Sequence, residues 1–223
     1  MVRWEDAPAE AAIKARIREL VTVYRGTAND LLGKEDGHIH PFSSGWYGRQ
    51  DEDTFKAIKA SASNFFRNIA KVPSNRLGWS TFTKRRAALR GPGYSRNSDR
   101  EGDSYGFIAW NCRATNDFGK VEAMAYLVNA YYHPLVKGYF TDLGVNVSDD
   151  LFALSTLVQW LWRARIRNHQ PVKPYIPSER MRDLFDRWLM SDSTPSLVRK
   201  IAGGEITFPL HHRPRREPLA IAA

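Results

Sequence analysis

The chain has 223 residues, which is long enough for one hydrophobic core with appended elements. Its composition, 43% hydrophobic and 26% charged with 7 tryptophans, is that of a globular protein and excludes disorder of the whole chain. The single cysteine excludes an intrachain disulfide and a cysteine-rich zinc site, and no apolar run approaches the length of a membrane span. We therefore expect a soluble protein of the cytoplasm.

The charge balance indicates a polyanionic partner. The formal net charge is +9 and the isoelectric point is about 9.8. Nucleic acid, either DNA or RNA, is the commonest partner of such a protein, and an acidic membrane surface comes second. Charge alone does not choose between them.

The N-terminal part is expected to be helical. Apolar residues recur at helical spacing over residues 8–32, and again over residues 54–71. A long polar loop separates these helices, over residues 33–53. Its two histidines, His38 and His40, lack the further ligands that a metal ion needs, so we predict no metal site.

Three short segments have the length and the residue content of strands. They span residues 77–82, 107–110 and 172–176, and the last contains prolines, which suit only an edge strand. A short basic helix is expected over residues 83–90, directly after the first of them. The predicted fold class is therefore α/β, a small sheet flanked by helices.

Three longer helices are predicted in the second half, over residues 122–143, 149–167 and 178–189. Pro134 is expected to kink the first, and Ser178 to cap the last. These elements divide the chain into a helical N-terminal region with its polar loop (1–71), an α/β domain (72–190) and a flexible basic tail (191–223).

The predicted helix over residues 149–167 carries the first candidate site. Gln159, Arg163 and Arg167 are spaced i, i+4, i+8 and fall on a different face from the leucines. Such a row suits an anion, most plausibly phosphate, because arginine donates forked hydrogen bonds. A solvated basic face explains the same pattern equally well.

The second candidate is the most basic stretch of the chain, which contains Lys84, Arg85, Arg86 and Arg90. In a protein that is basic as a whole, such a stretch is typical of contacts to the phosphate backbone of a nucleic acid. The alternative is again a solvated helix face.

The third candidate is the polar turn over residues 111–117, which contains Arg113, Thr115 and Asn116. It follows a predicted strand directly, and this is where an α/β fold places a ligand site. The alternative is an ordinary turn in which Thr115 or Asn116 caps a helix.

Several motifs occur in a characteristic succession. They are Trp79-Ser-Thr-Phe82-Thr-Lys, Phe107-Ile-x-x-Asn111-Cys112-Arg113-Ala114-Thr115-Asn116-Asp117, Leu154-Ser-x-Leu157-x-Gln159-Trp-x-Trp162-Arg163-x-x-Ile166-Arg167, and Tyr175-Ile-Pro177-Ser-x-Arg180-Met181-Arg182. This succession resembles the C-terminal part of phage- and plasmid-borne DEAD/DEAH-type superfamily 2 helicases. The resemblance covers roughly residues 64–189.

The resemblance implies a RecA-type lobe in which residues 113–117 couple nucleic acid to the nucleotide site. It also implies that Gln159, Arg163 and Arg167 form the catalytic set that reaches the γ-phosphate of ATP. Such helicases take their phosphate loop and Mg²⁺ carboxylate from another lobe. This sequence has neither: Gly33-Lys34 lacks the rest of a phosphate loop, and no apolar strand precedes Asp51-Glu52-Asp53.

Two functions remain open. The first is a helicase C-terminal-lobe-like protein, a fragment or a split subunit, that binds nucleic acid and hydrolyses ATP with Mg²⁺ only beside a separate ATPase lobe, so that it binds no cofactor alone. The second is a non-enzymatic nucleic-acid-binding protein of a plasmid or phage, acting in replication or regulation. An adaptor for an acidic partner or a membrane surface is a weaker third.

Overall fold

A sheet of three parallel strands forms the centre of the computed structural model, which describes residues 8–29, 40–95, 106–112, 117–191 and 193–202. The strands follow the order β1 (Leu77–Ser80), β2 (Ala123–Tyr126), β3 (Lys173–Tyr175). Single parallel bridges extend the sheet on both sides, since Phe107 pairs with Trp79 and Val21 pairs with Val172.

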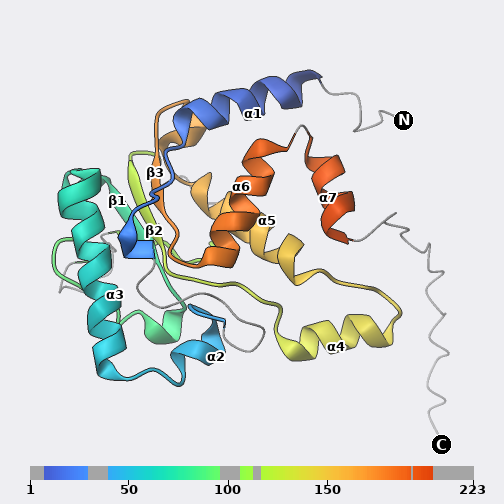
Figure 1. Ribbon diagram of the computed structural model, residues 1–223, viewed down its shortest axis with the longest axis horizontal. Coiled ribbons are helices and arrows are strands. Elements are labelled where there is room, and N and C mark those ends of the chain that lie inside the picture. Colours follow the sequence, from blue (N-terminus) through green and yellow to red (C-terminus); the bar gives the residue numbers. More distant parts are fainter. Residues whose placement is uncertain (1–7, 30–39, 96–105, 113–116, 192, 203–223) are drawn as a thin grey trace, which may run out of the picture.

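Helices cover both faces of this sheet (Figure 1). One face packs against α3 (Glu52–Asn64), which continues into a π-helical turn (Phe65–Ala70). The other packs against α5 (Asp149–Leu161) and α6 (Glu179–Met190). The remaining helices are α1 (Pro8–Leu20), which packs on α6, α2 (Ser44–Tyr47), α4 (Pro134–Asp142), and α7 (Thr194–Ala202), which packs on α5 and α6.

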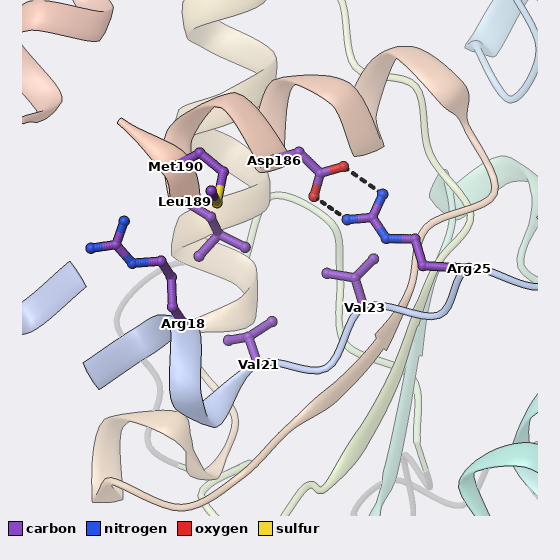
Figure 2. Close-up of a pocket in the computed structure, with 7 residues that line it drawn as sticks. All are labelled: Arg18, Val21, Val23, Arg25, Asp186, Leu189 and Met190. Carbon is purple, nitrogen blue, oxygen red and sulfur yellow. Dashed lines mark hydrogen bonds and ion pairs between the residues drawn. The ribbon is translucent and has the colours of Figure 1, made fainter. Parts of the chain in front are cut away.

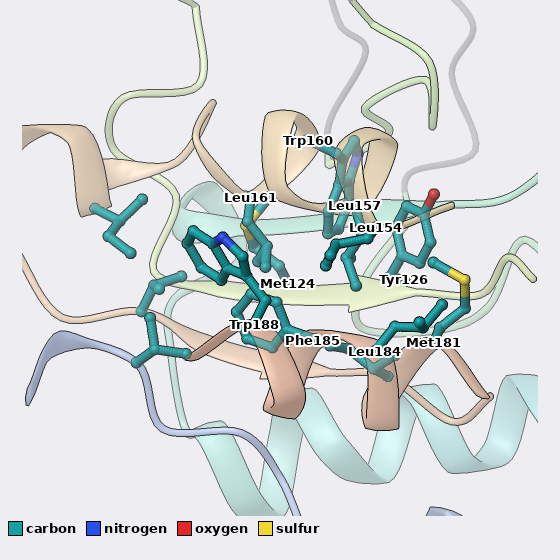
Figure 3. Close-up of a cluster of buried hydrophobic side chains, with 14 of the residues drawn as sticks. Met124, Tyr126, Leu154, Leu157, Trp160, Leu161, Met181, Leu184, Phe185 and Trp188 are labelled. Atoms are coloured by element: carbon teal, nitrogen blue, oxygen red, sulfur yellow. The ribbon is translucent and has the colours of Figure 1, made fainter. Parts of the chain in front are cut away.

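The larger core lies between β2, α5 and α6 (Figure 3). It contains apolar side chains that these three elements direct toward one another, among them Met124, Tyr126, Leu154, Leu157, Trp160, Met181, Leu184 and Phe185. Every residue of β2 is fully buried, because helices cover the strand on both faces. The predicted α/β architecture, a small sheet flanked by helices, is confirmed.

The helix predicted over residues 122–143 is wrong. This stretch contains the central strand β2, then an irregular segment, and only then the short helix α4. A strand buried on both faces has no polar alternation, so its apolar run is easily read as part of a helix. Pro134 does not kink a helix but starts one, at the first position, where its missing N–H costs nothing. The helix α4 leaves Leu135 77% and Tyr139 62% exposed.

Most of the other predicted elements are present. The strands β1 and β3 and the helices α3 and α6 lie where they were expected, with Asp51 accepting from the Thr54 N–H (2.8 Å) and Ser178 accepting from the Met181 N–H. The helix α1 ends earlier than predicted, at Leu20, because the next residues turn to run beside β3, where the Tyr24 N–H donates to the Pro174 carbonyl.

Three other segments differ from their predictions. The basic helix is only a 3₁₀ turn (Thr83–Arg85) followed by irregular turns, and the segment around Phe107 contributes a single bridge rather than a strand. Beyond Met190 no element was predicted, yet α7 forms there and buries Leu197. The division of the chain at residues 71 and 190 stays a prediction.

Candidate functional site

The three parallel strands place their carboxyl ends along one edge of the sheet. Thr81 and Phe82 follow β1 there, Leu127 follows β2, and Ile176 follows β3. In open α/β sheets, ligands bind in the crevice outside this edge, which we call the carboxyl edge.

The residues Lys84, Arg85, Arg86 and Arg90, which we call the basic segment, begin two residues after Phe82 at the carboxyl edge. Lys84 is exposed and the three arginines are half-buried. The guanidinium of Arg86 lies over the ring of Phe107, 4.5 Å from its centre. This cation–π contact fixes the basic segment against the segment over residues 106–112.

A pocket of about 180 Å³ opens between that segment and α5. We call it the Trp110 pocket. Its lining consists of Trp110, Asn111 and Cys112 from one wall and Phe152, Ser155, Thr156 and Gln159 from the other. The ring of Trp110 packs edge-on against Phe82 (5.4 Å) and against Phe152 (6.3 Å). Phe82, which packs on Trp110, is also the residue from which the chain runs on to the basic segment.

The wall that carries Trp110 is held in place from both sides. On one side the Ile108 N–H donates to the carbonyl of Trp79 in β1 (2.9 Å). On the other side Nε1–H of Trp160 donates to the carbonyl of Ile108 (3.0 Å). Trp160 is fully buried and packs against Tyr126, with ring centres 4.9 Å apart. The sequence predicted none of these contacts.

The predicted single face of Gln159, Arg163 and Arg167 is wrong, because α5 ends at Leu161. Beyond it, Ala164 has an extended backbone (ψ −176°), and the next N–H donates to the carbonyl of Val121 (3.2 Å). Gln159 is exposed and lines the Trp110 pocket. Arg163 is half-buried just after the end of α5, and Arg167 is half-buried in the 3₁₀ turn (Arg165–Asn168).

Arg113, Thr115 and Asn116 lie outside the described residues. The two flanks of their turn are described, and both lie beside the elements that carry the candidate residues. On the first flank, Cys112 lines the same pocket as Gln159. On the second, the carbonyl of Gly119 accepts from Nδ2 of Asn168, in the 3₁₀ turn that also holds Arg167 (3.3 Å).

Comparison of this chain with known proteins shows the family to which it belongs. A family model described as the YonV C-terminal Rossmann-like domain matches residues 15–189. The chain belongs to this family. Among curated proteins it is similar to the SPbeta prophage-derived uncharacterized protein YonV of Bacillus subtilis (strain 168), with 32% identity over 180 residues. That alignment covers 81% of this chain and 40% of the relative, and no solved structure matches.

Membership of the YonV family supports the Rossmann-like reading of the parallel sheet, and the prophage-derived relative fits the expected mobile element. The chain spans 40% of the relative's length, so the activity of the whole relative is not assigned to it. Within the described part of the chain, no helix has the length and apolar character to cross a membrane.

A buried network at the carboxyl edge of this Rossmann-like domain was missed in the sequence. Arg180 donates to the Asn129 side chain (2.8 Å), to the Ala130 carbonyl (3.0 Å) and to Asp150 (2.9 Å), and its guanidinium lies over the ring of Tyr131. The Arg180 side chain is only 13% exposed. The network joins α5 and α6 to the segment that follows β2. These residues are far apart in the sequence and come together only in the folded chain.

The two acidic residues in the first turn of α5 bind neighbouring segments, since Asp149 accepts from the Tyr132 N–H and Asp150 accepts from Arg180. Burial of Asp149 opposes its ionisation, but hydrogen bonds from Lys137 and from the Tyr132 N–H hold the pKa of its carboxyl below the ordinary value. The side chain of Ser148 accepts one of the free N–H groups in the first turn of the helix, from Leu151.

A larger pocket of about 420 Å³ lies between α6 and the segment that follows α1 (Figure 2). Arg25 and Asp186, which line it, form a two-pronged ion pair, with N–O distances of 2.6 and 2.5 Å. This pocket opens near the C-terminal end of α6, at the start of β3, and so at the opposite edge of the sheet. Ligands of open α/β sheets bind at the carboxyl edge, so we do not assign the site here.

Proposed function

We propose that this Rossmann-like domain binds nucleic acid along the carboxyl edge of its sheet, as a helicase C-terminal-lobe-like unit that works with a separate ATP-binding lobe. The observation that carries the proposal is the contact of Arg86, in the basic segment, with Phe107, next to the packing of Phe82 on Trp110. Cations and aromatic rings would then act together on one strand, as in proteins that bind single-stranded nucleic acid.

The basic segment supplies the electrostatic part of this function. Lysine and arginine side chains neutralise backbone phosphates and release condensed counterions, which gives affinity that depends steeply on salt. The overall charge of +9 strengthens this attraction at long range. Contacts of this kind carry no sequence information, so the proposal covers both DNA and RNA.

The nucleotide part of the proposal concerns Gln159 and Arg163. Gln159 lines the Trp110 pocket, whereas Arg163 follows the end of α5, where the chain turns toward Val121 and Glu122 just before β2. Positioned beside the γ-phosphate of a bound nucleotide, an arginine stabilises the charge that spreads over the transferred oxygens. The phosphate loop and the Mg²⁺ carboxylate would come from the separate lobe. The relative offers room for such a lobe, because this chain spans only 40% of it.

The second candidate function is nucleic-acid binding without ATP hydrolysis, in replication or regulation of the mobile element. The basic segment alone would be sufficient for it. The two functions share their first requirement, binding at the carboxyl edge, and differ in whether Arg163 acts on a phosphate.

We expect the double substitution Lys84→Gln/Arg85→Gln to weaken binding of a single-stranded oligonucleotide. Removing two phosphate contacts should lower the slope of log affinity against log salt by about 1.4, since each contact contributes about 0.7 on single strands. Fluorescence anisotropy of a labelled 12-nucleotide strand, measured at four salt concentrations, gives this slope directly.

The matched control is Lys71→Gln/Lys120→Gln, which changes the net charge equally. Lys71 and Lys120 are exposed and lie shortly before β1 and β2, at the opposite edge of the sheet. Their replacement should leave the slope nearly unchanged. Equal slopes for the two double variants would show that the carboxyl edge is not the binding surface.

A further inference from the structure

We propose that the Trp110 pocket holds one unpaired nucleobase, so that the domain selects single-stranded over double-stranded nucleic acid. The inference rests on the proposed function and adds to it the identity of the group that enters the pocket. The basic segment would then position the sugar–phosphate backbone, while the pocket takes a base that has left its stack.

The size of the pocket fits a single planar ring system. Its volume is about 180 Å³, and an engineered cavity of about 150 Å³ is already large enough to bind benzene. Pockets for drug-sized ligands start at about 300 Å³, so a whole nucleotide with its phosphates does not fit inside. The sugar and the phosphates would remain outside, on the side of the basic segment.

The walls of the pocket are aromatic and already ordered. Trp110 is held between Phe82 and Phe152, and Phe152 is itself stacked on Tyr132, with ring centres 4.3 Å apart and an angle of 25° between the planes. Rings that are fixed before the ligand arrives lose little conformational entropy on binding. Every base has a π-face, so stacking on such a wall tolerates any sequence.

The polar groups at the rim suit the edge of a base. Asn111 and Gln159 are exposed, and each side-chain amide offers both donors and an acceptor. The hydroxyls of Ser155 and Thr156 already donate to the carbonyl of Phe152 (3.0 and 2.8 Å), so their protons are engaged within α5. The two amides therefore remain to pair with the base, as amide side chains do with base edges.

A comparison of two oligonucleotides tests the inference. One is a 12-nucleotide oligothymidylate, and the other has the same sugar–phosphate chain without bases. Stacking of one base is worth roughly a 5- to 150-fold difference in affinity, so the abasic strand should bind that much more weakly. Trp110→Ala should lose the same factor on oligothymidylate and nearly nothing on the abasic strand. Trp110→Phe should retain most of the affinity.

Trp162→Ala is the matched control, because Trp162 follows α5 but does not line the pocket. It should bind oligothymidylate as the unaltered protein does. If Trp110→Ala does not fold, two measurements still test the base pocket. They are the affinity of Gln159→Ala, a variant on the exposed rim, for oligothymidylate, and the affinity of the unaltered protein for each of the two strands. Equal affinity of the unaltered protein for both strands would overturn the base pocket and leave the proposed function standing. Binding to neither strand would overturn both.

Discussion

Arg163→Ala should lower nucleic-acid-stimulated ATP hydrolysis by about 10³- to 10⁵-fold when the separate lobe is present. Arginines that reach across to a transferring phosphate contribute this much to the rate, because they neutralise charge that develops only in the transition state. We expect kcat to fall while the affinity for the oligonucleotide changes little, since the basic segment provides most of the binding. Release of phosphate at saturating single-stranded DNA measures the effect.

The separate lobe for this experiment is the part of the YonV relative that the alignment leaves out, about 60% of its length given that 40% is covered. Arg187→Ala in the last turn of α6 is the control, because Arg187 lies on another helix and outside the Trp110 pocket. Hydrolysis that survives Arg163→Ala, or a mixture that never hydrolyses ATP, would favour the non-enzymatic function instead.

Trp160→Ala should lower the free energy of unfolding by about 3–5 kcal/mol. The side chain is fully buried against Tyr126, and its removal leaves a large cavity and an unpaired carbonyl at Ile108. A domain of this kind has only about 5–15 kcal/mol in total, so the variant should be close to unfolding at 37 °C. Urea denaturation followed by circular dichroism gives the value.

This substitution also bears on the site, because Trp160 holds the wall of the Trp110 pocket through Ile108. Trp162→Ala serves as the comparison: that side chain is 37% exposed, and its loss should cost no more than about 1 kcal/mol. Similar losses for the two tryptophans would show that Trp160 does not have the central packing role assigned to it.

Local signals in the sequence were sufficient for the elements with clear ends. Ser178 caps α6 as predicted, and Asp51 and Ser148 cap α3 and α5 in the same way, by accepting a free N–H of the first turn. The strands β1 and β3 were predicted from their short length and their residue content. At these helix ends and strands, interactions between residues close in sequence determine the conformation.

The central strand β2 could not be predicted, because its burial on both faces is a tertiary property. The end of α5 was also missed, since neither glycine nor proline marks it. The chain leaves the helix because Arg165 turns toward the start of β2, where its N–H donates to Val121 and its guanidinium pairs with Glu122 (2.7 Å). A partner more than forty residues away decides where the helix stops.

The candidate site divides in the same way. The charge of the basic segment and the polarity of Gln159 follow from the residue types alone, so the sequence predicts them. The Trp110 pocket is not, since it needs Phe82, Trp110 and Phe152 from three separate segments. The same holds for Arg180, whose partners lie in the segment after β2 and in α5. Sequence patterns indicated candidate residues of the site, and the fold showed which side chains are in contact.

Hydrogen–deuterium exchange on the full chain, with and without a 12-nucleotide single strand, tests the central claim most directly. Backbone amides that a ligand covers or rigidifies exchange more slowly. We expect slower exchange within residues 83–90, 107–112 and 152–161, and no change in α1 or α3. Protection confined to α1, α3 or the Arg25–Asp186 pocket, or no protection at all, would contradict nucleic-acid binding at the carboxyl edge.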